Sequence, residues 1–148
     1  MSFKIVRPQL ATLLGTVDTI QEVSSSPKIK FNGYPAAHVI PSENSADYET
    51  STENVRTYAF KVRLFYETKN TGVEGALEAL EEVVDSVLDL LDQEDQKGGT
   101  TRTVGIGLPA GYTYLNIWAT PGAWGQVVQE ELIMAELTVG VRISVDVT

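Results

Sequence analysis

The chain has 148 residues, a formal net charge of −9 and no cysteine. This length fits a single domain, residues 1–148, and the lack of thiols excludes a disulfide framework, thiolate zinc sites and a cysteine nucleophile. The eleven Lys and Arg residues are scattered along the chain, whereas a surface that neutralises DNA phosphates needs clustered cations. The acidity therefore either serves solubility or provides a wall past which nucleic acid slides without specific binding.

No segment approaches the ~20 consecutive apolar residues that a membrane span needs. Lys4 and Arg7 precede an apolar run at 10–17, as in a signal peptide. However, Pro8 and Thr12 interrupt the pattern, and no small-residue cleavage site follows it. We therefore expect a soluble chain that is made in the cytoplasm and has no membrane partner.

Near the N-terminus, apolar residues recur at the three- and four-residue spacing of a helix: Val6, Leu10, Leu13, Leu14, Val17 and Ile20. Pro8 would lie in the first turn of this helix, where proline is tolerated. Residues 24–27, Ser-Ser-Ser-Pro, favour a turn that ends it. Short strands at 28–31 and 36–40 are expected next, joined through the Asn-Gly turn at 32–33 into a hairpin or tight corner.

Residues 41–54 are rich in Ser, Thr, Glu, Asn and Asp and have little to bury. We expect a polar loop of about fourteen residues there, which is long for a compact domain and therefore suggests a function. An alternating strand is predicted from Val55 to Thr68, followed by a turn at 69–72. A long amphipathic helix is predicted from Val73 to Asp95, with one aliphatic stripe that begins at Val73 and includes Leu77. Its many carboxylates are spread over the outer face, so we expect a solvated surface and not a catalytic one.

After a polar linker at 96–101, strands are predicted at 102–108 and 112–120, with a turn at 121–125. The last predicted strand, from Glu130 to Val147, alternates apolar and polar residues. Unbroken, it would span roughly 60 Å, whereas a domain of this length is about 40 Å across. Either such long strands find partners in another copy of the chain, or Gly140 marks a bulge that bends the strand within one sheet.

The chain shows no convincing catalytic, cofactor or metal site. Gly105, Gly107 and Gly111 lack the spacing of a dinucleotide loop, and a strand pattern follows them where a phosphate-binding helix would be needed. The single histidine, His38, lies in a short predicted strand and has no evident catalytic or metal-binding partners. We therefore predict a protein that is not an enzyme and holds no cofactor.

Aromatic residues are the better candidates for a binding surface. Trp124 falls in a Gly-rich predicted turn, where a core role is awkward, and tryptophan is enriched at interface hot spots. The candidate subunit or partner interface comprises Tyr48, Tyr58, Trp118 and Trp124. The alternative is that the first three fill the core.

The order of elements resembles that of the tail terminator (tail completion) proteins of long-tailed bacteriophages. The resemblance rests on the segment 33–40 (Gly-Tyr-Pro-Ala-Ala-His-Val-Ile), the polar stretch behind it, the alternating strand 56–67, the acidic amphipathic helix and the closing strand 131–146. It spans nearly the whole chain but is one of pattern and order, without a diagnostic motif. It implies an α+β domain with a mixed or antiparallel sheet of long strands against helices, assembled as a hexameric ring.

In such a family the ring caps the tail tube, stops its polymerisation and presents a surface to head or neck proteins at the head-tail junction of the virion. The implied partners are therefore further copies of the chain, the tail tube protein and a neck or head-completion protein, with DNA passing through the lumen unbound. Asp47, Glu49 and Glu53 are candidate lumen-facing acids. Two alternatives within the virion remain open, a different neck or head-completion protein and the tail tube subunit itself. An unrelated binding domain and a small α+β enzyme are the alternatives from other classes.

Overall fold

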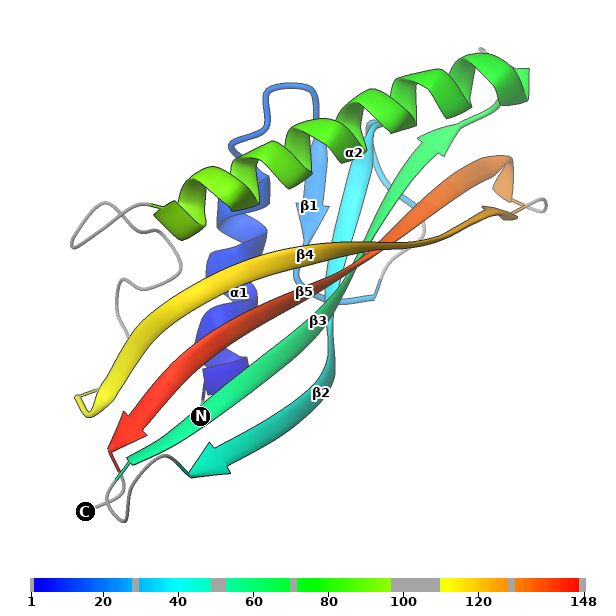
Figure 1. The fold of residues 1–148 in the computed structure, drawn as a ribbon. Helices are drawn as coiled ribbons and strands as arrows, with labels where there is room; N and C mark the ends of the chain where they lie inside the picture. The colour runs from blue at the N-terminus through cyan, green and yellow to red at the C-terminus, as the bar shows by residue number, and fades with distance from the viewer. Residues whose placement is uncertain are drawn as a thin grey trace.

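The computed structural model describes residues 2–27, 30–48, 53–69, 72–96, 110–127 and 130–146. The strand predicted at 102–108 lies outside these ranges, as do parts of the predicted strand 28–31 and of the turns around 70 and 98. In chain order the elements are α1 (Ser2–Leu14), β1 (Glu22–Ser24), β2 (Ala36–Tyr48), β3 (Glu53–Glu67), α2 (Gly72–Gln96), β4 (Tyr112–Val127) and β5 (Leu132–Asp146). The fold is α+β, as predicted, with a five-stranded mixed sheet packed against two helices (Figure 1).

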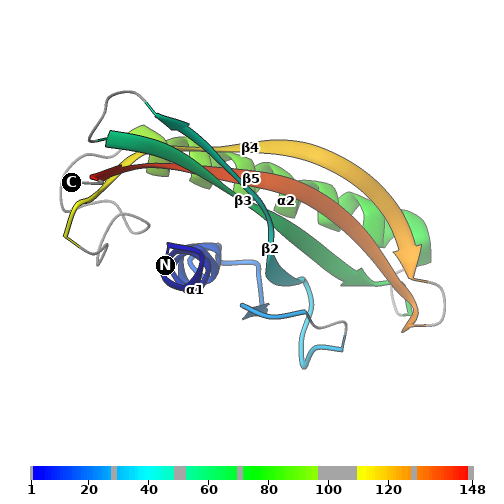
Figure 2. The same cartoon turned by 90° about the horizontal axis from the view of Figure 1, so that it is seen from below.

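The strands follow the order β1-β2-β3-β5-β4 across the sheet. β1 pairs in parallel with the start of β2, and the other neighbouring strands are antiparallel. β3 and β5 have 15 residues each, or about 50 Å at ~3.3 Å per residue. The 25 residues of α2 span only about 37 Å at ~1.5 Å per residue. The long strands, which bend in a common arch in Figure 2, therefore extend beyond the helix that covers them.

A single apolar core joins both helices to the same face of the sheet. Its strand members are Ala37 and Val39 of β2, Tyr58, Phe60, Val62 and Leu64 of β3, Tyr114 and Ile117 of β4, and the odd-numbered residues 133–145 of β5. α1 contacts mainly β2, whereas α2 contacts β3, β4 and β5. Figure 1 shows α2 running lengthwise along the sheet and α1 crossing behind the strands. We call this side of the sheet the helix-bearing face and the opposite side the helix-free face.

α1 buries the predicted apolar stripe but ends sooner than predicted. The helix stops at Leu14, where the hydroxyl of Thr16 donates a hydrogen bond to the Leu13 carbonyl (2.6 Å). This bond satisfies one of the carbonyls that a helix end leaves without a partner. Val17 and Ile20 still pack against the core after the helix has ended. Pro8 lies inside the helix and not in its first turn, so that detail of the prediction is wrong.

The first strand is not where the sequence predicted it. β1 occupies 22–24, and the described residues Lys30 and Phe31 are not in a strand. Phe31 instead packs against Phe65, with ring centroids 5.5 Å apart. A strand of three residues is too short to produce a period in the sequence, which explains why β1 was missed.

The polar loop predicted at 41–54 is wrong over the residues that the structure describes. β2 continues to Tyr48, β3 begins at Glu53, and the two strands pair from Ala36 opposite Phe65 to Tyr48 opposite Asn54, with one bulge between Pro41 and Glu43. This polar segment forms a strand because its backbone groups hydrogen-bond to β3. Amino-acid composition does not reveal such backbone pairing, so the sequence predicted a loop. Residues 49–52 lie outside the described part of the hairpin.

The turn predicted at 121–125 is also part of a strand. β4 runs to Val127 with a register shift between Pro121 and Trp124. Proline and glycine are tolerated because β4 is an edge strand of the sheet. Gly122 is required by close packing, since a Cβ atom there would lie 2.9 Å from the carbonyl oxygen of Glu136.

The bulge considered at Gly140 is absent, because β5 pairs without a shift through Gly140 to Ala59 on one side and Trp118 on the other. The long helix is confirmed as α2. Seven of its acidic side chains are exposed, as predicted: Glu74, Glu78, Glu81, Glu82, Asp85, Asp89 and Asp92. Glu94, near the end of the helix, is buried. Val73 and Leu77, however, are exposed although they begin the predicted apolar stripe.

Candidate assembly surface

The structure separates the four aromatic candidates. Tyr58 is 2% exposed and belongs to the core, so it offers no surface to a partner. Tyr48 ends β2. Trp118 and Trp124 lie on β4 and are 38% and 44% exposed. The expectation that Trp124 is exposed is confirmed, although it lies in a strand and not in a turn.

The acidic candidates gather at one end of the sheet. Asp47 lies on β2 opposite Val55, and Glu53 begins β3 opposite Asp146 of β5. Glu49 lies outside the described residues.

Both edges of the sheet include long stretches that no described strand covers. β1 pairs only with residues 36–38, which leaves the outer edge of β2 from Glu43 to Tyr48 without a neighbouring strand. On the other side, no described strand pairs with the outer edge of β4. Such edges present backbone N–H and C=O groups that can pair with another chain.

The outer edge of β4 is interrupted along most of its length. The Ile117 backbone N–H donates a hydrogen bond to Oδ1 of Asp95 in α2 (2.8 Å). Further along, Pro121 has no N–H to donate, and the register shift follows it. These features hinder strand addition from Ile117 onward. The portion from Tyr112 to Asn116 has neither a proline nor a charged residue.

Exposed large apolar side chains concentrate around β4. Among the described residues they are Val73, Leu77, Leu115, Trp118 and Trp124. Three belong to β4, and the other two begin α2, whose N-terminal end lies at the same end of the sheet as the end of β4 in Figure 1.

Val73, Leu77 and Trp124 lie at the same end of the molecule. Trp124 pairs with Ala135, a buried core residue, which places position 124 on the helix-bearing face. The contact between Asp95 and Ile117 serves as a common reference point. Measured from it, Leu77 lies about 27 Å toward the start of α2, at ~1.5 Å per residue. Trp124 lies about 23 Å toward the end of β4, at ~3.3 Å per residue. We call Val73, Leu77 and Trp124 the far-end patch.

Trp118 has a different environment from Trp124. It lies opposite Gly140 on the helix-free face, and a Cβ atom at Gly140 would overlap its indole ring. Because Gly140 has no side chain, the Trp118 indole can pack directly on the backbone at this position. Trp118 thus covers backbone that would otherwise be open to solvent.

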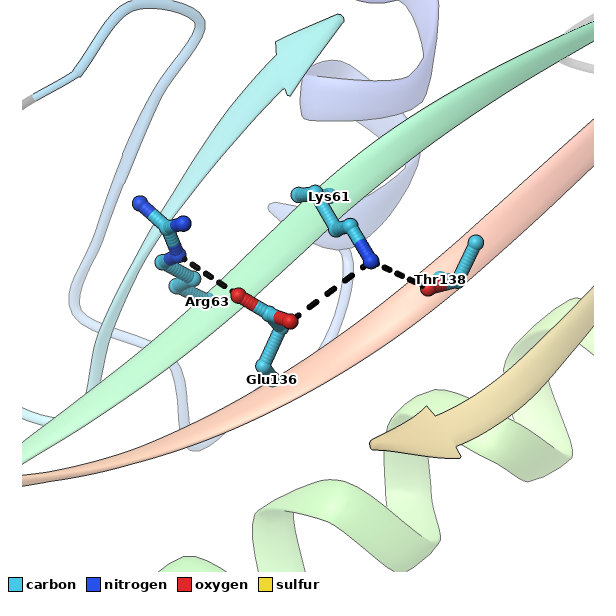
Figure 3. Close-up of polar contacts among 4 residues, drawn as sticks. All are labelled: Lys61, Arg63, Glu136 and Thr138. Carbon is cyan, nitrogen blue, oxygen red and sulfur yellow. Dashed lines mark hydrogen bonds and ion pairs between the residues drawn. The ribbon is translucent and has the colours of Figure 1, made fainter. Parts of the chain in front are cut away.

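The helix-free face also holds a charged cluster that joins β3 to β5 (Figure 3). Nε of Arg63 donates to Oε2 of Glu136 (2.9 Å), and Nζ of Lys61 lies 3.6 Å from Oε1 of the same carboxylate. Lys61 also donates to Oγ1 of Thr138 (3.0 Å). The hydrogen bond from Arg63 lowers the pKa of Glu136; partial burial opposes this, and the charges of Lys61 and Arg63 add to the lowering. Arg63 lies opposite Glu136 and Lys61 opposite Thr138, so the cluster favours this strand register.

The described residues include no group of three or more His, Asp or Glu side chains that could hold a metal ion. His38 is buried on the helix-free face, with its ring 5.1 Å from that of Phe65. No helix in the described part of the chain has both the length and the apolar character needed to cross a membrane.

The same fold occurs in a virion. One chain from the virion of a native gene transfer agent (GTA) particle aligns with a TM-score of 0.52 and 17% sequence identity. The alignment covers 96% of this chain and 93% of that chain. At this identity the similarity shows a shared fold over nearly the full length of both chains. No protein-family model and no curated protein matches the sequence.

Sequence reasoning missed the charged cluster and the exposed start of α2. Alternation alone places Lys61 and Arg63 on one face of their strand, and Glu136 and Thr138 on one face of theirs. Which residues stand opposite each other depends on the register between strands that are 73 residues apart in the chain. Leu115 was missed because its exposure follows from the register shift between Tyr114 and Asn116.

Proposed function

We propose that this protein is a structural virion protein that assembles into a ring, of six copies, at the end of a phage tail tube. The ring caps the tube, ends its polymerisation and offers a docking surface to the neck or head-completion protein. The protein acts at the head-tail junction and is assembled in the host cytoplasm. It has no enzymatic role in this proposal.

The observation that carries the proposal is the fold shared with a chain of a gene transfer agent virion over 96% of this protein. The order of elements, which resembles that of tail terminator proteins, supports the more specific role. The edges of β2 and β4 that no described strand covers, together with the exposed apolar residues on β4 and at the start of α2, support assembly with other chains.

The three acidic candidates, Asp47, Glu49 and Glu53, are proposed to face the lumen. A negative wall does not bind DNA, so DNA passes without specific contacts. The net charge of −9 agrees with this role. The far-end patch is proposed to contact a second virion protein, either the tail tube protein or the neck protein.

Two alternatives come from the same virion, a different neck or head-completion protein and the tail tube subunit. A tube subunit stacks into long polymers, whereas a terminator stops at one ring. The test is light scattering combined with negative-stain images of the purified protein over a range of concentrations. We expect closed rings of uniform diameter and no filaments. Long tubes would favour the tube subunit, and a particle that remains monomeric at every concentration would contradict ring assembly.

A further inference from the structure

We propose that a groove between α2 and the connection from α1 to β1 holds an extended basic segment of a second virion protein. Lys or Arg side chains of that segment contact the carboxylates of the groove, and its apolar side chains lie on the floor. The inference rests on the proposed function in taking the partner to be a virion protein, and the site is separate from the far-end patch. We call this hollow the α2 groove.

The α2 groove consists of two adjoining cavities of about 510 and 410 Å³. Both are lined by Asp18, Thr19 and Ser86, so they form one continuous hollow. Its lining on α2 runs from Ala79 to Gln93, which is about 21 Å at ~1.5 Å per residue. An extended segment of about six residues covers this length at ~3.3 Å per residue. In Figure 1 the connection from α1 to β1 passes α2 near the middle of the helix.

The wall opposite α2 is fixed by backbone hydrogen bonds. The N–H of Ile20 donates to the carbonyl of Val17 (3.0 Å), and the side chain of Ile20 is buried in the core. The N–H of Gln21 donates to the carbonyl of Pro35 (2.8 Å), which joins the wall to the floor of the groove. The groove is therefore formed before a partner arrives, and a partner binds without having to order it.

The floor of the α2 groove is apolar and aromatic. It comprises Tyr34, Pro35, Tyr66, Ala79 and Val83. Tyr34 and Tyr66 are partly exposed, whereas Pro35 and Val83 are buried beneath them. An apolar side chain laid on this floor leaves water and also removes the aromatic carbon from it, which favours binding.

The remaining lining of the groove is acidic. Asp18, Glu82 and Asp89 contribute exposed carboxylates, and no Lys or Arg is among the residues that line the two cavities. In the described part of the chain, none of these three carboxylates forms an ion pair. A cationic partner can therefore contact them without breaking an existing contact.

This combination of charge and apolar surface selects the occupant. The carboxylates repel the phosphates of nucleic acid. A second copy of the chain has a net charge of −9, which disfavours it as well. A segment that alternates apolar and basic residues fits both features, since its apolar side chains share one face. The long Lys and Arg stems can bend back from the other face, so that their charged ends contact the rim.

Peptide binding to the full chain tests the groove. The probe is a fluorescein-labelled hexapeptide of alternating lysine and leucine, and the comparison peptide has serine in place of leucine. Fluorescence anisotropy should show tighter binding of the lysine-leucine peptide, because only this peptide has side chains for the floor. Added salt should weaken its binding, because the carboxylates are exposed and their charges are screened.

Two matched double variants locate the charges that the peptide contacts. Glu82→Gln with Asp89→Asn removes two carboxylates from the groove and should weaken binding of the lysine-leucine peptide by about 3- to 10-fold. Glu81→Gln with Asp92→Asn removes the same charges from exposed positions on the same helix that do not line the groove. This control should change binding by less than about 2-fold.

A further variant tests the shape of the groove at constant charge. Ser86 is exposed and lines both cavities, so Ser86→Phe should fill the place where they meet and weaken binding of the lysine-leucine peptide. Circular dichroism of each variant would verify that it is folded.

The outcomes separate this inference from the proposed function. Equal weakening by the two double variants would overturn the groove, because binding would then follow the acidity of the whole helix. Equal binding of the two peptides, unchanged binding by Ser86→Phe, or no binding at all would also overturn it. Rings in negative stain without selective peptide binding would leave the proposed function in place and remove the groove. Selective binding by a chain that never forms rings would support the groove and contradict the ring.

Discussion

The two faces of the sheet are held together by different physical means. On the helix-bearing face, apolar side chains from every long strand form one core with α1 and α2. On the helix-free face, no described helix packs. β3 and β5 carry a charged cluster there, and Trp118 of the edge strand β4 lies over Gly140 of β5. The first face obtains its stability from buried area. The second face also buries Phe65, Ala36 and Leu132. Around the charged cluster and Trp118, however, only a few side chains fit together, so single substitutions there report on individual contacts.

The largest effect expected on the helix-free face is at Gly140. A side chain at this position would displace the Trp118 indole from the strand beneath it, so Gly140→Val should lower the free energy of unfolding by about 1–3 kcal/mol. Urea denaturation followed by circular dichroism would measure this. The matched control is Gly125→Ala, because a Cβ atom at Gly125 would meet nothing within 4 Å; its unfolding free energy should change by less than about 1 kcal/mol. Equal losses in both variants would show that Trp118 does not depend on the glycine.

A smaller effect is expected in the charged cluster. Glu136→Gln removes the charge that Arg63 and Lys61 contact, and these side chains are 34% and 33% exposed, so the loss at pH 7 should be at most about 1 kcal/mol. The folded-state pKa of Glu136 is lowered from the ordinary value of 4.5. The stabilisation is therefore present above pH 4.5 and disappears as the pH falls through the folded-state pKa.

Unfolding curves of the parent and of Glu136→Gln should accordingly differ at pH 7 and converge toward pH 3. Thr138→Val is a useful comparison, since it removes the hydroxyl that accepts a hydrogen bond from Lys61 and leaves the Glu136 carboxylate in place. Its effect should not follow the titration of Glu136. A difference for Glu136→Gln that stays constant from pH 7 to pH 3 would show that the carboxylate charge contributes nothing to stability.

The contrast between the faces also explains what the sequence could predict. β3, α2 and β5 were predicted within about two residues of their observed bounds, because an apolar residue repeats at a fixed period wherever an element packs on the core. β2 beyond Pro41 and β4 beyond Pro121 were predicted as loop and turn, since pairing with a neighbouring strand holds these polar and Gly-rich segments. Such pairing depends on residues far away in the sequence.

The candidate surface residues also differ in how far the sequence could predict their roles. The exposure of Trp124 followed from its Gly-rich neighbourhood, whereas alternation could not distinguish a core role from an interface role for Tyr58, which the structure places in the core. Glu136 and its cationic neighbours could not be grouped from the sequence, because the register between β3 and β5 brings them together.

The smallest effect on stability is expected at Trp124, which compares the two exposed tryptophans directly. Trp124 and Trp118 are similarly exposed, but only Trp118 covers a glycine whose space it fills. Trp124→Ala should therefore leave the melting temperature nearly unchanged while weakening assembly or partner binding, because a large exposed aromatic side chain contributes most when a partner buries it. Trp118→Ala should lower the melting temperature by several degrees, at about 2–4 °C per kcal/mol for a chain of this size. Thermal unfolding and light scattering on both variants would measure the two effects together. A melting temperature that falls as far for Trp124→Ala as for Trp118→Ala would assign Trp124 to the packing of α2 against β4 and remove it from the assembly surface.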